Sequence, residues 1–243
     1  MSDRTEKTRE IHTDCENSIE EKIGRKQNII ELLKKSLLAT IGLMCFGAGD
    51  YLTIQANIGV APWDTLNLGL SETFGILYGT ASIGVSLTLI VIDLLLKEHI
   101  GIGTILDAIV VGKTVDLLNW LDLVPKQENI WISIAMMFIG FFIMGLSQVM
   151  YMKAGLACGP RDSFMIAIGK RLNKIPIGAV NIMILIVVLA AGWQLGGPIG
   201  IGTVLAAFGI GIMMQLAFNI TKFEPKSVVH ENILQSFARI KRQ

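Results

Sequence analysis

Apolar residues fill most of the chain between residues 36 and 220, in long runs separated by short polar or glycine-rich stretches. A membrane-spanning helix needs roughly 20 mainly apolar residues. Windows that meet or nearly meet this length lie at residues 36–56, 79–96, 101–120, 130–152, 176–195 and 199–220. The pattern therefore predicts an all-α, polytopic membrane helix bundle with about six transmembrane helices.

Two further segments, 62–74 and 160–172, have helical propensity but are too short and too polar to span a bilayer comfortably. Each begins with a Pro-x-Asp motif directly after an apolar run, PWDT in the first and PRDS in the second. We expect two half-helices that are re-entrant or interfacial. A model in which both cross the membrane, giving eight crossings, stays open as an alternative.

The composition supports a membrane class: 52% of the residues are hydrophobic, 17% are charged, and the mean hydropathy is +0.58. The charges gather in an N-terminal tail, 1–35, and a basic C-terminal tail, 221–243. Residues 16–35 and an amphipathic stretch of the C-terminal tail could form interfacial helices, or the tails are solvated and only set the topology. The net charge of +1 says little about partners, because the charges are unevenly placed; no nucleic-acid partner is expected, and no signal peptide is visible. The partners expected are the lipid bilayer and an unknown small solute, and a homo-oligomer stays open.

Orientation follows from the lysines and arginines, which favour the cytoplasmic side of a membrane. With six crossings, the cytoplasmic parts hold both tails, Lys97 and the basic cluster from Lys153 to Lys174, while the outer loops hold only Lys126. We therefore expect a multi-pass membrane protein with both termini in the cytoplasm. The eight-crossing model places more basic residues outside.

The chain contains an internal repeat. An offset of 98 residues aligns IGLMCFGAGD…ANIGVAPWDT with IGFFIMGLSQ…AGLACGPRDS, and an offset of 99 aligns GIGTILDAIVVG with GIGTVLAAFGIG. Repeat 1 covers residues 36–126 and repeat 2 covers 127–220. Each holds three spans and one half-helix, so the second enters the membrane upside down. Inverted repeats are a common plan of transporters and channels, although a duplication that only built a stable bundle would leave the same pattern.

The half-helix motifs have two interpretations. Pro62 and Pro160 suit the first helical turn, where Asp64 and Asp162 are favoured by free N–H groups and the helix dipole. The two acids then cap their own helices, or they bind a cation or a coupling proton. Trp63 and Arg161 share one position of the motif, which we interpret as facing opposite sides of the membrane.

Ionisable groups at membrane depth are costly and normally face a partner or a cavity. Lys113 and Asp116, three residues apart, are predicted to pair with each other. The alternative is a polar substrate or ion path. Its candidate residues, some of which match in the repeat, are Asp50, Asp64, Asp162, Lys113, Asp116, Gln148, Gln215, Ser82 and Asn181.

Small residues allow close packing of helices in lipid. We assign this role to the paired glycines Gly101, Gly103, Gly200 and Gly202, with Thr104 and Thr203 as helix N-caps. The three cysteines follow no metal or redox spacing, and we expect Cys45 to be buried in its helix. No metal site, cofactor motif or catalytic motif is visible, so an enzyme is not expected.

The chain resembles the YczE/YyaS/YitT family of bacterial multi-pass inner-membrane proteins. The motifs that carry this resemblance are ANIGVAPWDTLNLGLSETFG, GIGTILDAIVVGKTVD, AGLACGPRDSF and GGPIGIGT, within residues 36–219. The resemblance implies a multi-pass protein of the bacterial plasma (inner) membrane with about five or six spans. The function expected is transport of a small solute or metabolite along a path lined by intramembrane acids, and the competing class is a membrane scaffold or accessory factor for a biosynthetic or envelope complex.

Overall fold

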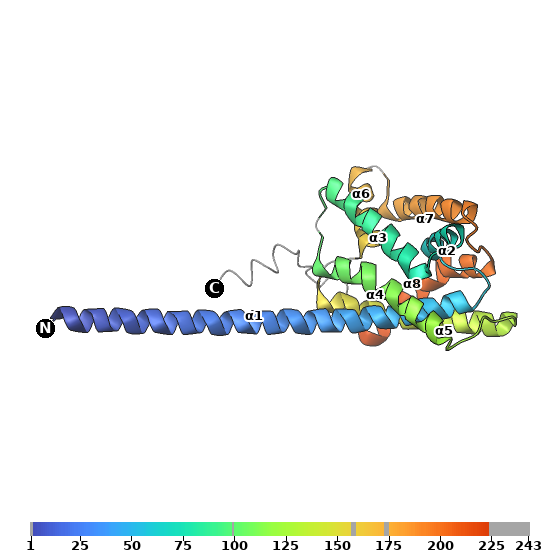
Figure 1. The fold of residues 1–243 in the computed structure, drawn as a ribbon. Coiled ribbons are helices and arrows are strands. Elements are labelled where there is room, and N and C mark those ends of the chain that lie inside the picture. The colour runs from blue at the N-terminus through green and yellow to red at the C-terminus, as the bar shows by residue number, and fades with distance from the viewer. Residues whose placement is uncertain (1, 99, 157–158, 173–174, 224–243) are drawn as a thin grey trace.

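The computed structural model describes residues 2–98, 100–156, 159–172 and 175–223, and every regular element in them is an α-helix (Figure 1). The helices are α1 (Ser2–Gln55), α2 (Pro62–Phe74), α3 (Tyr78–Leu95), α4 (Ile102–Leu121), α5 (Ile130–Ala154), α6 (Pro160–Arg171), α7 (Ile177–Gln194) and α8 (Ile201–Thr221). The predicted all-α class is therefore confirmed. The amphipathic stretch expected in the C-terminal tail lies outside the described residues.

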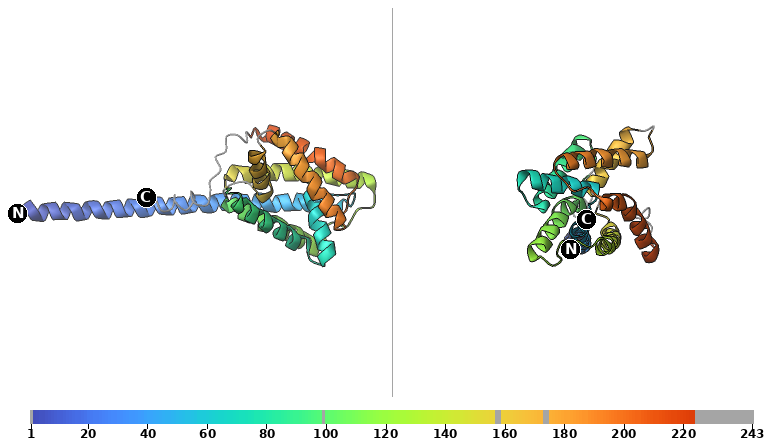
Figure 2. Two further views of the ribbon diagram at one scale, coloured as in Figure 1. Left: turned by 90° about the horizontal axis from the view of Figure 1, so that it is seen from above. Right: turned by 90° about the vertical axis from the view of Figure 1, so that its right-hand side faces the viewer.

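Helix α1 runs on without a break from the N-terminal tail into the bundle, and its first half projects far beyond the other helices (Figure 1). Its second half packs against α5 and α4, and α5 in turn packs against α8. Seen end-on, α1 and α5 form one layer with α4 and α8 on either side, and α2, α3, α6 and α7 lie above them (Figure 2). In this upper group α2 packs on α7 and α3 packs on α6.

Small residues set the distance between α1 and α5, which cross in antiparallel directions. A Cβ added to Gly49 would lie 2.7 Å from the Gly140 carbonyl oxygen, and one added to Gly42 would lie 3.2 Å from the Ser147 carbonyl oxygen. The repeat offset of 98 relates Gly42 to Gly140 and Gly49 to Ser147. The two contacts are therefore made by equivalent positions of the repeat units.

Two loop hydrogen bonds show the same relationship. The Gly103 N–H donates to the Leu156 carbonyl oxygen at 2.8 Å, and the Gly202 N–H donates to the Ile58 carbonyl oxygen at 2.7 Å. Gly103 corresponds to Gly202 and Ile58 corresponds to Leu156. In each unit a glycine N–H thus donates to the loop that precedes the half-helix of the other unit. A side chain at either glycine would force the two backbones apart.

The ends of the half-helices are anchored in the same reciprocal way. The Thr73 hydroxyl donates to the Leu195 carbonyl oxygen at 2.9 Å, and the Arg171 guanidinium donates to the Leu96 carbonyl oxygen at 2.7 Å. Thr73 corresponds to Arg171, and Leu96 to Leu195. Each half-helix therefore ends against the last turn of the long helix from the other unit.

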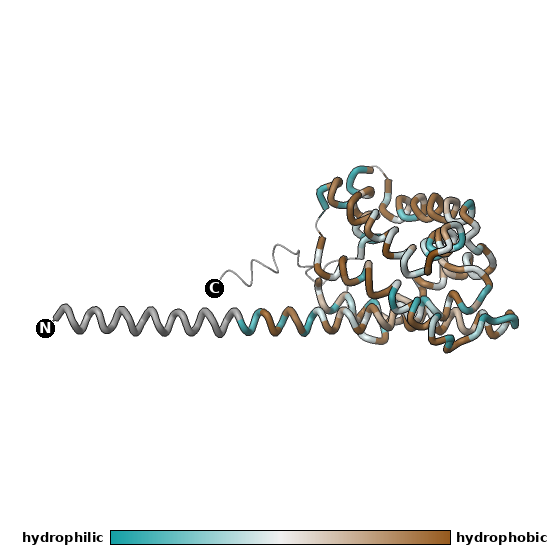
Figure 3. Tube along the Cα trace, viewed as in Figure 1, coloured by the Kyte–Doolittle hydropathy of each residue, from teal (hydrophilic) through white to brown (hydrophobic). Residues whose placement is uncertain are grey.

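Within the described residues, four helices are long and apolar enough to cross a membrane: α3, α5, α7 and α8. Hydrophobic residues, drawn in brown, predominate in the bundle, whereas the coloured part of α1 is mixed (Figure 3). The predicted span at 101–120 is not among the four, because α4 carries three charged residues, Asp107, Lys113 and Asp116, and the predicted span at 36–56, in the last part of the long helix α1, is not among them either. The structure therefore supports a polytopic helical membrane protein with at least these four candidates.

Two smaller expectations are corrected. Cys45 is exposed on α1, where Gly47 and Gly49 instead make close contacts with α4 and α5. Thr104 and Thr203 are not N-caps: the N-cap residues are Gly101 and Gly200, whose N–H groups donate to the threonine hydroxyls at 3.2 and 3.3 Å. The threonines thus act from the third helical position, as the returning half of a capping box.

Candidate functional site

The two half-helices begin in nearly the same way. Ala61 precedes α2 with φ −62° and ψ 154°, and Gly159 precedes α6 with φ −62° and ψ 161°. Pro62 and Pro160 follow as the first helical residues, as predicted, because proline lacks only an N–H that would have no partner there. The next residues in each helix, Trp-Asp and Arg-Asp, supply the site.

The Asp64 carboxyl group contacts Tyr78 on α3, and α2 has no side-chain hydrogen bond at its N-cap. The Oδ1 atom of Asp64 lies 2.9 Å from the Tyr78 hydroxyl oxygen, and the same hydroxyl lies 2.8 Å from Oδ2 of Asp50. The three side chains come from α2, α3 and α1 and are at most 5% exposed. A tyrosine therefore joins two buried carboxyl groups, one of them in the predicted first span and the other in the predicted half-helix.

Arg161 brings a positive charge from α6 to this group. Its Nη1 atom is 3.8 Å from Oδ1 of Asp64, and its guanidinium carbon lies 5.4 Å from the centre of the Trp63 ring. Cation–π contact of this kind is favourable when it is shielded from water. The expectation that Trp63 and Arg161 face opposite sides is wrong, because the two half-helices point their first turns toward each other.

A second acid approaches the start of α6. A Cβ added to Gly159 would lie 2.8 Å from Oδ2 of Asp107 on α4, so the carboxyl group rests directly against the backbone there. Asp107 lies within electrostatic range of Arg161 and Asp162. Asp162 itself is an exposed residue. The two half-helix acids are thus in different surroundings, although the sequence treats them as equivalents.

Several polar atoms beside this group lack a hydrogen-bond partner among the described residues. They include Oδ1 of Asp50 and both side-chain polar atoms of Asn67, which is fully buried one turn after Asp64 on α2. Unsatisfied buried groups of this kind are costly. The polar cluster, defined as Asp50, Asp64, Asn67, Tyr78 and Arg161, therefore has unused capacity to bind a donor or an acceptor.

An apolar cavity of about 740 Å³, open to the surface of the bundle, lies next to the polar cluster, between α2, α3, α6 and α7. Trp63 lies between the two, since it lines the cavity and its ring contacts Arg161 of the polar cluster. The lining follows the repeat, because the offset of 98 relates its residues in pairs: Leu66 with Phe164, Leu70 with Ile168, and Phe74 with Leu172. The cavity thus lies where the two half-helices meet.

The other predicted path residues are not gathered here. Lys113 is exposed, while Oδ1 of Asp116 accepts the Gly79 N–H at 2.7 Å, so the predicted Lys113–Asp116 pair is replaced by a bond between α4 and α3. Gln215 is exposed and its amide donates to Asn219. The remaining candidates are separate: Gln148 half-buried on α5, Ser82 buried on α3, and Asn181 half-buried on α7.

Sequence reasoning missed the roles of Tyr78, Asn67 and Arg161. Tyr78 begins an apolar window, where an aromatic residue is ordinary, and Asn67 stands in a segment expected to be polar. One signal was present, since Asn67 follows Asp64 by three residues and so shares its helix face. In the part of the chain that the structure describes, no group of three or more His, Cys, Asp or Glu residues is arranged to hold a metal ion.

Comparison with known proteins gives the family. A model described as a family of unknown function, DUF6198, matches residues 33–219. The chain belongs to this family. The match begins in the second half of α1 and ends near the end of α8. The part of the chain that matches DUF6198 is therefore the helical bundle.

Relatives of this DUF6198 member include an uncharacterized membrane protein, YczE, of Bacillus subtilis (strain 168), 30% identical over 189 residues, which are 77% of this chain and 86% of YczE. An uncharacterized protein of Haemophilus influenzae is 30% identical over 186 residues, 74% of this chain and 84% of its own. The uncharacterized protein YyaS of Bacillus subtilis is 30% identical over 187 residues, 75% of this chain and 91% of its own. The resemblance to the YczE/YyaS family is confirmed. No solved structure matches significantly.

Proposed function

We propose that this protein is a permease of the bacterial inner membrane that moves a small solute with an apolar portion. The observation that carries the proposal is the 740 Å³ cavity between the half-helices, with the buried polar cluster directly behind Trp63. Small-molecule sites are typically apolar cavities of 300 to 1,000 Å³ with a few polar groups that fix orientation. In transporters, such sites lie where broken helices of two repeats meet.

The proposal includes an inverted repeat of two three-span units. The antiparallel crossing of α1 and α5 and the reciprocal contacts of the two units support it, because a two-fold operation exchanges the members of each pair. The six spans would be the bundle part of α1 together with α3, α4, α5, α7 and α8. Helices α2 and α6 would be half-helices that enter from opposite sides.

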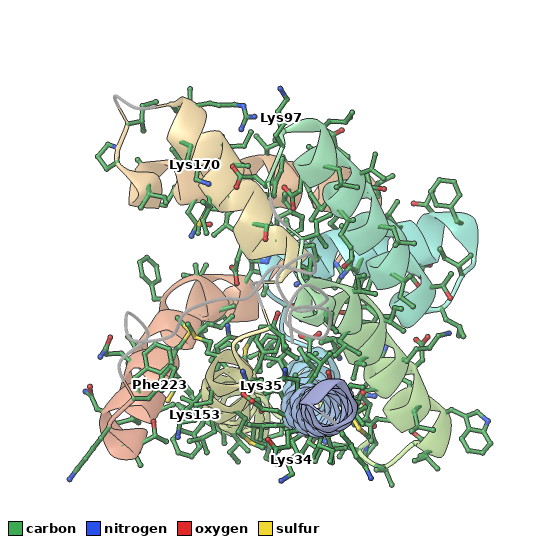
Figure 4. All side chains as sticks on the ribbon, turned by 90° about the vertical axis from the view of Figure 1, so that its left-hand side faces the viewer. Lys34, Lys35, Lys97, Lys153, Lys170 and Phe223 are labelled. Atoms are coloured by element: carbon green, nitrogen blue, oxygen red, sulfur yellow. The ribbon has the colours of Figure 1, made fainter. Side chains whose placement is uncertain are left out.

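The orientation proposed places both termini in the cytoplasm. Lys34, Lys35, Lys97, Lys153 and Lys170 lie at the end of the bundle from which α1 projects (Figure 4). Lys126 lies beside Gln127, whose N–H donates to the Gln55 carbonyl oxygen at the other end of α1. This distribution fits the enrichment of lysine on the cytoplasmic side.

The experiment fills the cavity without disturbing the packing. Gly84 lines the cavity, and a Cβ added there meets no atom within 4 Å. Gly84→Phe therefore places a ring in the cavity. Gly211→Phe is the matched control, because Gly211 also has open space around its position but lies on α8, away from the cavity.

The purified protein is screened against small amphipathic solutes by thermal unfolding, since a ligand present at 100 times its Kd stabilises the folded state by about 2.7 kcal/mol. Hits are then tested for uptake into proteoliposomes. We expect stabilisation and uptake in the unmodified protein and in Gly211→Phe, and loss of both in Gly84→Phe. Equal stabilisation of the two variants by a solute would show that the solute binds outside the cavity. Stabilisation without uptake would indicate that the protein binds the solute but does not transport it.

A scaffold or accessory factor is the second candidate, because the first half of α1 projects beyond the bundle (Figure 1). Deleting residues 1–25 separates the two functions. A permease keeps solute uptake after this deletion, whereas a scaffold loses its role in the cell while Gly84→Phe leaves that role intact.

A further inference from the structure

The Tyr78 hydroxyl lies within hydrogen-bond distance of two carboxyl groups at once, at 2.8 Å from Oδ2 of Asp50 and 2.9 Å from Oδ1 of Asp64. A phenol has one proton to donate, and an ionised carboxylate can only accept. If both acids were ionised, one of the two short contacts would be oxygen against oxygen without a proton. The geometry therefore requires one additional proton on one of the two acids.

The surroundings show which acid holds it. Asp64 lies 3.8 Å from the Arg161 guanidinium, and a cation at this distance favours the ionised carboxylate. Asp50 is 2% exposed, and its Oδ1 has no hydrogen-bond partner among the described residues. An ionised carboxylate there would leave a buried charge without direct compensation, which is costly.

The helices packed around Asp50 offer no further cation. The charged groups that act on it are Asp64 from α2 and Arg161 from α6, with Tyr78 from α3. On α4, Asp116 accepts the Gly79 N–H and Lys113 is exposed. On α5, the titratable residues lie toward the opposite end, with Tyr151 packed near Ala39 and Lys153 over the Phe223 ring.

We propose that Asp50 is a proton-binding site, with its carboxyl group donating to the Tyr78 oxygen while the Tyr78 hydroxyl donates to Asp64. This deepens the proposed permease function, on which its role rests, by naming the proton as the coupling ion. The chain permits a balanced transfer: Asp50 gives its proton to Tyr78 as Tyr78 gives its own to Asp64, so the phenol is unchanged and one proton has moved between the acids.

The transfer also changes the partner of Arg161. With the proton on Asp50, Asp64 is the counter-ion of Arg161. With the proton on Asp64, that carboxyl is neutral, Arg161 loses its partner, and the negative charge lies on Asp50 in α1. Since Arg161 belongs to the second repeat unit and both acids belong to the first, the position of one proton alters the attraction between the two half-helices.

The test is infrared spectroscopy of the full-length protein in lipid nanodiscs at neutral pH, which detects the C=O band of protonated carboxylic acids without any transport assay. We expect Asp50→Asn to lose the intensity of one protonated carboxyl, and Asp122→Asn, at an exposed residue, to lose none. Tyr78→Phe is expected to shift the band, whereas Tyr51→Phe, whose hydroxyl donates to Val124, is not. A folded Asp50→Asn protein with the full band would overturn the proposal.

Stability gives the second readout. Asparagine presents an N–H donor where the protonated acid presents O–H, so Asp50→Asn is expected to fold and to melt at or above the temperature of the unmodified protein. An Asp50→Asn protein that fails to fold, or that melts well below it, also contradicts a protonated Asp50. Because the band is measured without solute, its loss can occur even if the cavity-filling experiment shows no permease, and the two proposals fail separately.

Discussion

Trp63 and Arg161 occupy the same position in the two repeat units, and their side chains contact each other, with the guanidinium carbon 5.4 Å from the ring centre. If a two-fold axis relates the units, a contact between equivalent residues must lie on that axis. Chemically the pair is unlike, since one unit supplies an aromatic ring and the other a cation. The first unit thus supplies two buried acids, Asp50 and Asp64, and the second unit supplies the cation that pairs with Asp64.

Removing the charge of Arg161 is expected to destabilise the protein. Asp64 has a side chain that is 3% exposed, so Arg161→Ala leaves a buried carboxylate without its cation. Loss of one partner of a fully buried pair costs 3–5 kcal/mol. Because the Arg161 side chain is 27% exposed, we expect about 2 kcal/mol in thermal unfolding of the purified protein.

Two further variants test the cause of this loss. Asp64→Asn in the Arg161→Ala background is expected to recover part of the stability, because it removes the uncompensated charge. Arg161→Lys keeps the charge but loses the planar contact of the guanidinium with Trp63. Its melting temperature is therefore expected to lie between those of Arg161→Ala and the unmodified protein. An Arg161→Ala protein as stable as the unmodified one would show that the pair contributes nothing.

The two short helices α2 and α6 could be predicted from the sequence, whereas the contact between them could not. A proline followed by an acid after an apolar run marks a helix start locally, and α2 begins and ends at the predicted residues. Whether Asp64 caps its own helix or reaches Tyr78 depends on where α3 lies, which no local pattern records. Tyr78 also gives no local signal, because one hydroxyl hardly changes an apolar window. The contact of Trp63 with Arg161 depends in the same way on the arrangement of the two units.

The crossing of α1 and α5 should tolerate no side chain at Gly49. A Cβ there would lie 2.7 Å from the Gly140 carbonyl oxygen and 2.7 Å from Cγ of Met144, so the helices must separate to admit it. We expect Gly49→Ala to lower the free energy of unfolding by about 1–3 kcal/mol, the usual cost of overpacking. Gly211→Ala, in open space on another bundle helix, is the control and should be neutral or slightly stabilising.

Asp116 and Lys113 should differ in their importance, although the sequence suggests a pair. Asp116→Ala removes the acceptor of the Gly79 N–H between α4 and α3 and is expected to cost about 1–3 kcal/mol, the penalty of an unsatisfied buried donor. Lys113→Ala changes an exposed residue and should stay within about 0.5 kcal/mol. Equal losses in thermal unfolding would instead support the Lys113–Asp116 pair. Asp116→Asn keeps an acceptor oxygen and should recover most of the stability.

The inverted arrangement predicts that the ends of the two half-helices face opposite sides of the membrane. Thr73 ends α2 beside Leu195, and Arg171 ends α6 beside Leu96, and both are exposed. In a background in which the native cysteines are replaced, single cysteines at these positions are labelled in intact cells with a membrane-impermeant maleimide. We expect the cysteine at position 73 to react from outside and the one at 171 to react only after the cells are opened, because the basic end of the bundle is cytoplasmic in the proposed topology.

Cysteines that replace Glu72 and Lys170, which are also exposed, serve as matched neighbours and should give the same result as positions 73 and 171. Reaction of positions 73 and 171 from the same side would exclude an inverted repeat, whatever the stability measurements show.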